Sequence, residues 1–235
     1  MSIKSGKLIS KSILLSKTAT VVALGKGERT AARIREVALD QFSRLGFERV
    51  TLAGIAEAAE VSQPTLHYHF RDKDHLWRSA MLELAAVIRD EERLLKAARD
   101  APPLTQLRMA MRMFLEVSWR HPALGRIIAL EGMAGGERLA WLNENLTGAR
   151  NRRLAELARR AMAAGELKPF PPELLVVTVQ AAAVGAVNLA PLLRSEFGYE
   201  PDTPEGRAAH EELILNALMQ GLVADRSGRD AEEAP

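Results

Sequence analysis

The chain contains no cysteine, and only 5% of its residues are aromatic. The absence of cysteine excludes disulfide bonds, thiol redox chemistry and thiolate metal ligands, and it fits a reducing cytoplasm, where we expect the protein to act. The sequence also lacks a Gly-rich phosphate loop, a GxSxG nucleophile elbow and an HExxH zinc motif. We therefore expect no enzymatic activity, no metal and no cofactor.

Two stretches are apolar enough to raise the question of a membrane or an export signal. The first lies in residues 1–25, where Lys17 interrupts the apolar run that an export signal needs. We therefore expect residues 1–27 to form a flexible basic extension. The second, residues 174–193, carries no charge and is long enough to cross a bilayer, but polar residues, glycine and proline dilute it. We expect a helix packed inside protein and no membrane, with a membrane-tethered protein as the alternative.

The 235 residues have an ordinary globular composition, with 47% hydrophobic and 26% charged residues. The net charge of +2 is unevenly distributed. Residues 1–76 hold 12 Lys and Arg against 8 Asp and Glu, a net +4, whereas residues 77–235 hold 20 against 22, a net −2. A basic N-terminal third on a slightly acidic body fits a nucleic-acid-binding domain joined to a second function.

No stretch alternates polar and apolar residues over the length of a strand, so the sequence predicts an all-α protein. Stop signals such as Gly46, Gly165 and Gly198 delimit the helices. The expected helices are Glu28–Leu45, Leu52–Ala59, a short helix that follows Ser62, Lys73 to about Arg99, Leu104–Arg120, Ala123–Met133, Arg138–Ala164, Glu173–Phe197 and Pro204 to about Leu222. The polar residues 223–235 are expected to be a disordered tail.

Thr51–Leu76, TLAGIAEAAEVSQPTLHYHFRDKDHL, is the most informative segment. It predicts two short helices around a tight turn and the start of a third, with N-cap residue types at Thr51, Ser62 and Asp72. Pro64 suits the first turn of the second helix. Polar side chains crowded onto that short helix suit a DNA major groove, so the pattern predicts a helix-turn-helix.

The candidate DNA contacts follow from side-chain chemistry. Gln63 is best suited to pair with adenine, beside further base contacts from Ser62, Thr65 and His69. The expected phosphate contacts are Arg29, Thr30, Thr51, His67, Tyr68 and Lys73, with Pro64 lying among them. Three alternatives stay open: Tyr68 and His69 pack into the domain's own core, Thr51 only caps its helix, or the histidines bind a metal. The last is disfavoured because residues i and i+2 on a helix face different ways.

Glu28–Leu76 resembles the DNA-binding domain of the tetracycline-repressor (TetR) family of bacterial transcription regulators. The matching positions are Gly46–Phe47, Thr51, Ile55–Ala56, Val61–Ser62, Leu66, Phe70, Lys73 and Leu76. The chain departs from the family at His67, where Tyr is usual, and at Ala53, where some members carry a base-reading Arg. The absence of an Arg at position 53 shifts base reading onto residues 62–69.

The resemblance implies a three-helix DNA-binding domain over residues 28–76, joined by a long helix to a larger ligand-binding and dimerisation domain over residues 77–222. It implies a homodimer through residues 173–222 that binds a double-stranded operator and releases it when a small molecule binds. Apolar stripes at Val177–Ala181–Val184–Asn188–Pro191 and Ile214–Ala217–Leu218–Gly221 agree with paired helices. An apolar or aromatic effector would contact Met109, Met113, Phe114, Trp119, Met133, Trp141, Gln180 and Asn188, residues that otherwise form plain core.

Two further interpretations compete with a repressor controlled by a small molecule. One is a DNA-binding dimer that is regulated by a protein partner or by no effector. The other is an enzyme with a catalytic cluster around His121 and Glu131 or Glu137, which would need a cleft holding ionisable groups with perturbed pKa values.

Overall fold

The computed structural model describes residues 25–92 and 100–223, and its helices fall into two compact units that divide between Ala80 and Met81. The expected N-terminal extension up to residue 24, the end of the long helix at 93–99 and the tail from residue 224 lie outside the described residues. Among the described residues there is no β-strand, only an isolated antiparallel bridge between Leu167 and Val223. The all-α expectation is confirmed.

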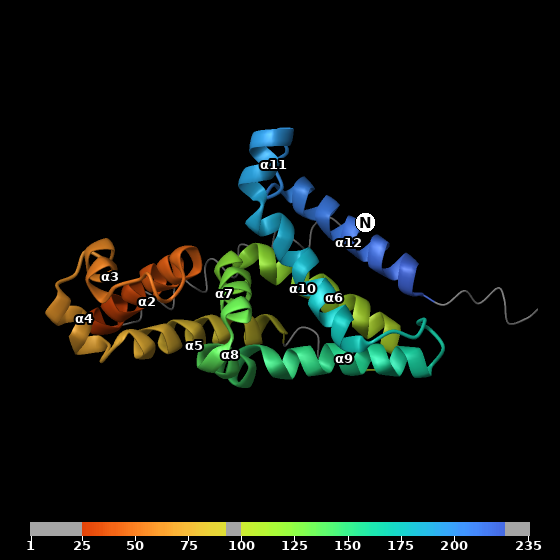
Figure 1. Cartoon of the computed structure of the whole chain (residues 1–235), viewed down its shortest axis with the longest axis horizontal. Helices are drawn as coiled ribbons and strands as arrows, with labels where there is room; N and C mark the ends of the chain where they lie inside the picture. Colours follow the sequence, from red (N-terminus) through yellow and green to blue (C-terminus); the bar gives the residue numbers. More distant parts are fainter. Residues whose placement is uncertain (1–24, 93–99, 224–235) are drawn as a thin grey trace, which may run out of the picture. The chain divides into compact units, whose positions relative to one another are not determined.

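The first unit contains α2 (Lys26–Leu45), α3 (Leu52–Ala58), α4 (Gln63–His69) and the start of α5 (Lys73–Glu92) (Figure 1). Its core is built from the inward residues of each helix. Phe42 stacks on Phe47 with ring centroids 5.6 Å apart, and Phe47 meets the edge of buried Trp77 at 6.4 Å. The remaining core residues are Ile34, Ala38, Val50, Ile55, Ala56, Ala59, Leu66, Phe70, Leu76 and Ala80.

Side-chain caps begin each short helix where the sequence predicts them. Thr51 Oγ1 accepts a hydrogen bond from the Gly54 N–H at 3.1 Å, and Ser62 Oγ accepts one from Thr65 N–H at 3.2 Å. Asp72 Oδ1 accepts from the His75 N–H at 2.7 Å. This backbone hydrogen bond lowers the pKa of the Asp72 carboxyl from its usual value. The hydrogen bond from the adjacent Arg71 guanidinium is the second cause of the lowered pKa.

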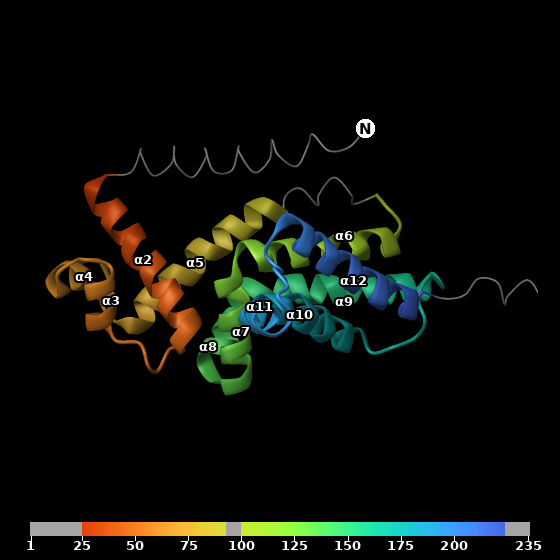
Figure 2. The ribbon, with the colours of Figure 1, turned by 90° about the horizontal axis from the view of Figure 1, so that it is seen from above.

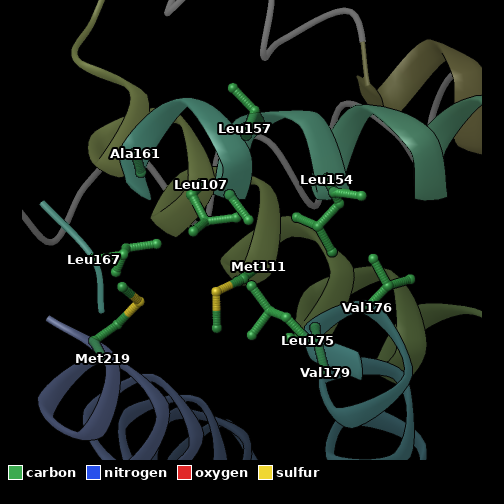
Figure 3. Packing of buried hydrophobic residues seen from close by; sticks show 12 residues of the cluster. Leu107, Met111, Leu154, Leu157, Ala161, Leu167, Leu175, Val176, Val179 and Met219 are labelled. Carbon is green, nitrogen blue, oxygen red and sulfur yellow. The ribbon is translucent and has the colours of Figure 1, made fainter. Parts of the chain in front are cut away.

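The second unit packs α6 (Pro103–Arg120) against α9 (Gly148–Ala163) and α10 (Pro172–Asn188). The helix α12 (Pro204–Leu222) lies against α6, and α7 (Pro122–Ala134) lies against α10 (Figure 2). Leu107 and Met111 of α6, Leu154 of α9 and Val179 of α10 meet in one buried cluster (Figure 3). Burial of apolar side chains of this kind contributes about 1.5–3 kcal/mol each, so this cluster is the principal source of the unit's stability.

Two expected helices are each broken in the structure. The segment expected as one helix from Arg138 to Ala164 is instead α8 (Gly136–Leu142), a π-helical turn (Asn143–Thr147) and α9. The Gly148 N–H bonds to the Asn143 carbonyl, and a Cβ at Gly148 would lie 2.3 Å from that oxygen. The wider π turn therefore depends on a glycine at position 148. The expected continuous α-helix is wrong because Gly148, which has no Cβ to clash with the Asn143 carbonyl, lets the backbone widen into this turn.

The segment expected as one helix from Glu173 to Phe197 ends as α10 at Asn188 and restarts as α11 (Ala190–Phe197), bent by 55°. Pro191 lies in the first turn of α11, where its missing N–H is tolerated, whereas inside a continuous helix it would clash with the preceding turn. Among the described residues no single helix has both the length and the apolarity to cross a bilayer, although α10 and α11 together meet those criteria as a bent pair.

His210 joins three helices of the second unit. Its Nδ1 accepts from Trp119 Nε1 of α6 at 3.1 Å, and its Nε2 lies 3.0 Å from the Ala182 carbonyl of α10, which requires a neutral ring with the proton on Nε2. Burial lowers the pKa of His210 from the usual 6.5, although the Ala182 hydrogen bond acts in the opposite direction. Arg207 and Glu211 are its charged neighbours on α12, and Glu211 pairs with Arg112 of α6.

This arrangement predicts that acid destabilises the second unit through His210. The unfolded chain binds a proton near pH 6.5 while the native ring stays neutral, so the free energy of unfolding falls as the pH drops below about 6.5 and levels off below the native pKa. Urea unfolding between about pH 8 and about pH 5 measures this. His210→Gln should reduce the pH dependence, and His67→Gln, at an exposed site, should leave it intact. Equal pH dependence in wild type and His210→Gln would contradict the assignment.

Candidate functional site

The helix α4 presents a polar surface that is anchored from below by two buried residues. Leu66 and Phe70 are buried in the core of the first unit. Ser62, Gln63, Pro64, His67 and Tyr68 are exposed, and Tyr68 retains 83% of its accessible surface. A short helix whose apolar side is buried in the domain and whose polar side is exposed can enter a DNA major groove.

Some of the predicted contact residues also have structural partners. Thr65 is half-buried, and its hydroxyl lies 2.8 Å from Ser62 Oγ, so both oxygens take part in the cap of α4. His69 is half-buried between the Tyr68 and Phe70 rings, close to Gly27 of α2. At the start of α2, Arg29 is exposed and Thr30 Oγ1 donates to the Lys26 carbonyl at 3.1 Å. Gln63, His67 and Tyr68 are the more accessible candidates.

The turn before α4 holds Glu60 at a φ of 50°, a left-handed conformation that costs a residue with a Cβ some strain. Its carboxylate pairs with Arg33 of α2, with Oε2 and Nη2 2.6 Å apart. The Val61 N–H bonds to the Ala56 carbonyl at 2.9 Å, which closes the turn. These contacts fix the position of α4 relative to α3.

Lys73 has partners that its position in the sequence does not reveal. Its Nζ donates to the carbonyls of Phe47 at 3.0 Å and Val50 at 3.1 Å, lies 3.5 Å from that of Glu48, and sits 4.3 Å from the Phe47 ring centroid. An ammonium group has three donors, and here they are directed at the turn between α2 and α3. Lys73 therefore holds this turn in the structure, and its phosphate contact stays a prediction.

Replacing Lys73 with Met should remove these hydrogen bonds while keeping an apolar stem, and should destabilise the first unit by about 1–3 kcal/mol. Lys26→Met, at an exposed position, serves as the control in thermal unfolding. The salt dependence of DNA binding separates the two roles, since loss of a phosphate contact reduces the slope by about 1. A flatter slope without a loss of stability would restore the phosphate role.

A cavity of about 220 Å³ lies between α6, α9 and α10 in the second unit. Of the eight residues predicted to contact an effector, Met113, Phe114 and Gln180 line it. The other five do not line it. Trp119 instead donates to His210, and Asn188 accepts a hydrogen bond from Arg126 Nε at 3.3 Å. Met109 and Met133 are exposed, and Trp141 also lies outside the lining. The lining residues that sequence reasoning missed are Ala110, Val117, Ala149, Arg150, Asn151, Arg153, Leu154 and Val179.

Of the residues considered for a catalytic cluster, Glu131 forms a structural ion pair. Glu131 is buried, and both of its carboxylate oxygens lie within about 3.1 Å of Arg138 Nε. This ion pair joins α7 to α8 across the Gly135–Gly136 turn. Among the described residues no group of three or more His, Asp or Glu side chains is placed to hold a metal ion.

Comparison with known proteins decides the family. The model of bacterial regulatory proteins of the tetR family matches residues 34–80, and that of the tetracyclin repressor-like C-terminal domain matches residues 103–218. The transcriptional regulator RutR of Escherichia coli (strain K12) is 31% identical over 193 residues, covering 80% of this chain and 84% of RutR. The chain belongs to the TetR family.

Solved structures share the TetR-family fold at low sequence identity. The ketosteroid transcriptional regulator KstR2 of Mycobacterium tuberculosis has a TM-score of 0.66 at 17% identity, over 83% of this chain and 95% of KstR2. AibR, in complex with isovaleryl coenzyme A and operator DNA, has a TM-score of 0.61 at 17% identity, over 80% of this chain and 97% of AibR. TetR-family members are DNA-binding transcription regulators rather than enzymes, which decides against the catalytic interpretation.

Proposed function

We propose that this TetR-family regulator is a homodimeric repressor that binds a palindromic operator and releases it when a small molecule enters the cavity between α6, α9 and α10. The proposal of DNA binding rests on the exposed polar side of α4, a helix held in place by the buried Leu66 and Phe70. Its site of action would be the cytoplasm, where operator DNA is found in bacteria.

The proposal of a dimer is supported by exposed apolar residues on α10 and α12. Leu174 and Val177 of α10 keep 62% and 60% of their surface, and Leu213 of α12 keeps 65%. Ala181, Ala217 and Gly221 extend the same exposed surfaces. Contiguous exposed apolar surface of this kind marks an interaction site, and a second copy of the chain would cover it.

Part of the interface predicted from sequence is occupied within the single chain. Val184 packs against Gly125 of α7, where a Cβ would come within 2.7 Å of the valine side chain. Asn188 bonds to Arg126 of the same helix. The proposed interface therefore centres on Leu174–Ala181 of α10 and Leu213–Gly221 of α12.

A connection between the first cavity and α5 is supported by a second cavity of about 180 Å³ in the second unit. Ala85 and Ile88 line it from α5, the helix whose first turns belong to the DNA-binding unit, together with the π turn. Arg150 lines both cavities. A ligand that displaces Arg150 could thus shift α5, provided that it binds the two conformations with different affinities.

A variant with the first cavity filled tests ligand control. Ala110→Phe should abolish binding of an effector without loss of operator affinity, whereas Ala140→Phe, at an exposed site on α8, should change neither. Small apolar metabolites are screened by thermal shift, and operator affinity is then measured by fluorescence anisotropy. Coupling of ordinary size would lower the affinity of wild type by about 5- to 150-fold.

The alternative is a DNA-binding dimer controlled by a protein partner or by no effector. It is favoured if no compound that stabilises wild type changes operator affinity, or if Ala110→Phe responds to the same compounds as wild type does. AibR, which shares the fold, has been crystallised with isovaleryl coenzyme A and operator DNA, which supports the ligand-controlled form as the first to test.

A further inference from the structure

The lining of the cavity between α6, α9 and α10 combines two arginines and two amide side chains with apolar residues. Arg150 and Arg153 contribute two cations, no Asp or Glu lines the cavity, and seven of the lining residues are apolar. These seven are Ala110, Met113, Phe114, Val117, Ala149, Leu154 and Val179. From this lining we propose that the effector is a small apolar monocarboxylate, an inference that rests on the proposed ligand control and specifies its chemistry.

Arg150 is the group that defines the charge preference. Its Nε and one Nη atom are buried against the protein, and its guanidinium carbon lies 5.0 Å from the Phe114 ring centroid. A guanidinium group on an aromatic face is oriented, and its positive charge attracts a carboxylate in the adjacent cavity. Because charge is costly to remove from water, an occupant that carries the opposite charge is favoured over a neutral one of equal size.

The amide groups in the cavity add donors on the same side. Gln180 Nε2 donates to Asn151 Oδ1 at 3.0 Å, so this bond uses the oxygen of Asn151. The Nδ2 group of Asn151, next to Arg150 on α9, is then available as a second donor for an anion. The effector's carboxylate would thus bind at the α9 side, and its apolar part would contact Met113 and Phe114 of α6.

The size of the cavity limits the effector to a small acid. An apolar cavity of about 150 Å³ holds benzene, and this cavity, at about 220 Å³, is somewhat larger. A benzene ring with a short acidic side chain fills such a space, whereas a molecule that carries a nucleotide does not. One carboxylate is enough to neutralise the charge of Arg150, so a single negative charge suffices for the effector.

Matched acids and amides test the inference by isothermal titration calorimetry on the full-length protein. Benzoate, phenylacetate and hexanoate are each compared with the amide of the same size, and 2-phenylethylammonium is the cationic control. At least one acid should bind about tenfold or more tightly than its amide, and the ammonium ion should not bind, because a hydrogen bond to a charged group is worth about that factor.

Substitutions of the two arginines show which of them causes the preference for an acid over its amide. Arg150→Gln should bring the acid down to the affinity of its amide, and Arg153→Gln should weaken the acid by a smaller factor. Arg160→Gln is the matched control, since Arg160 is exposed on α9 and does not line the cavity. Thermal unfolding of each variant shows that it is folded, and the comparison of acid with amide in wild type needs no variant at all.

The outcomes separate this inference from the proposed function. Binding of the amides as tight as that of the acids, no binding by any of the three acids at millimolar concentration, or unchanged acid binding in folded Arg150→Gln would overturn the inference. An amide that binds and releases operator would overturn it while upholding ligand control. An acid that binds through Arg150 without changing operator affinity would uphold the charge preference and refute ligand control.

Discussion

Replacing Ala217 with Asp is expected to separate the dimer and to abolish operator binding at the concentrations where wild type binds. Ala217 lies on the exposed surface of α12 between Leu213 and Gly221, so in the proposed dimer it is buried against the partner. A carboxylate buried there without a partner costs about 3–5 kcal/mol, and two-fold symmetry places it in the interface twice. The dimer dissociation constant should rise more than about 100-fold.

Sedimentation equilibrium measures this change, and Ala208→Asp is the matched control. Ala208 is also exposed on α12, but nine residues away, which on an α-helix is the opposite side. Both variants should unfold as wild-type monomers do, because neither position is buried in the single chain. If Ala217→Asp sediments as the wild-type dimer does, α12 does not form the interface.

Replacing Gln63 with Ala is expected to relax base selection by about 1–3 kcal/mol at one position in each half-site. Gln63 is exposed at the start of α4, where its amide can donate to and accept from an adenine edge. Thr51→Ala provides the contrast, because it removes the cap of α3 and should cost about 1 kcal/mol of stability while weakening all duplexes alike. Gel-shift titration against operator variants distinguishes them. An unchanged base preference in Gln63→Ala would assign base reading to other residues.

Local chemistry made several helices of both units predictable from sequence. The caps at Thr51, Ser62 and Thr203 depend on a hydroxyl and an N–H three residues later, so a short segment contains all that is needed. The same holds for the burial of Leu66 and Phe70, which follows from helical spacing. Helices α6 and α12 accordingly lie within one residue of their predicted bounds.

The features that were missed depend on contacts between distant residues. The donors of Lys73 meet carbonyls more than twenty residues earlier, a partnership with no local pattern. The cavity combines residues of three helices, so its arginines read as part of an ordinary Arg-rich helix until α6 and α10 are placed beside them. Val184 likewise looked free for a dimer until Gly125 was brought against it.

The basic charge of the N-terminal third does not lie in the helices of the DNA-binding unit. Residues 25–80 hold nine Lys and Arg against eight Asp and Glu, which is close to neutral. The basic excess of the N-terminal third comes from four lysines in residues 1–24, outside the described residues. Specific contacts of α4, rather than the overall charge of the helical head, therefore carry the case for DNA reading.

Selection of bound duplexes from a random pool tests the central claim most directly, using the full-length protein and its Gln63→Ala variant. The account predicts enrichment of a two-fold symmetric sequence whose half-sites lie about one helical turn of DNA, roughly 10 base pairs, or a multiple of it apart. It also predicts that Gln63→Ala changes the preferred base at one equivalent position in each half. Enrichment of no sequence, or of a motif that is not symmetric and that the α4 substitution leaves unchanged, would contradict it.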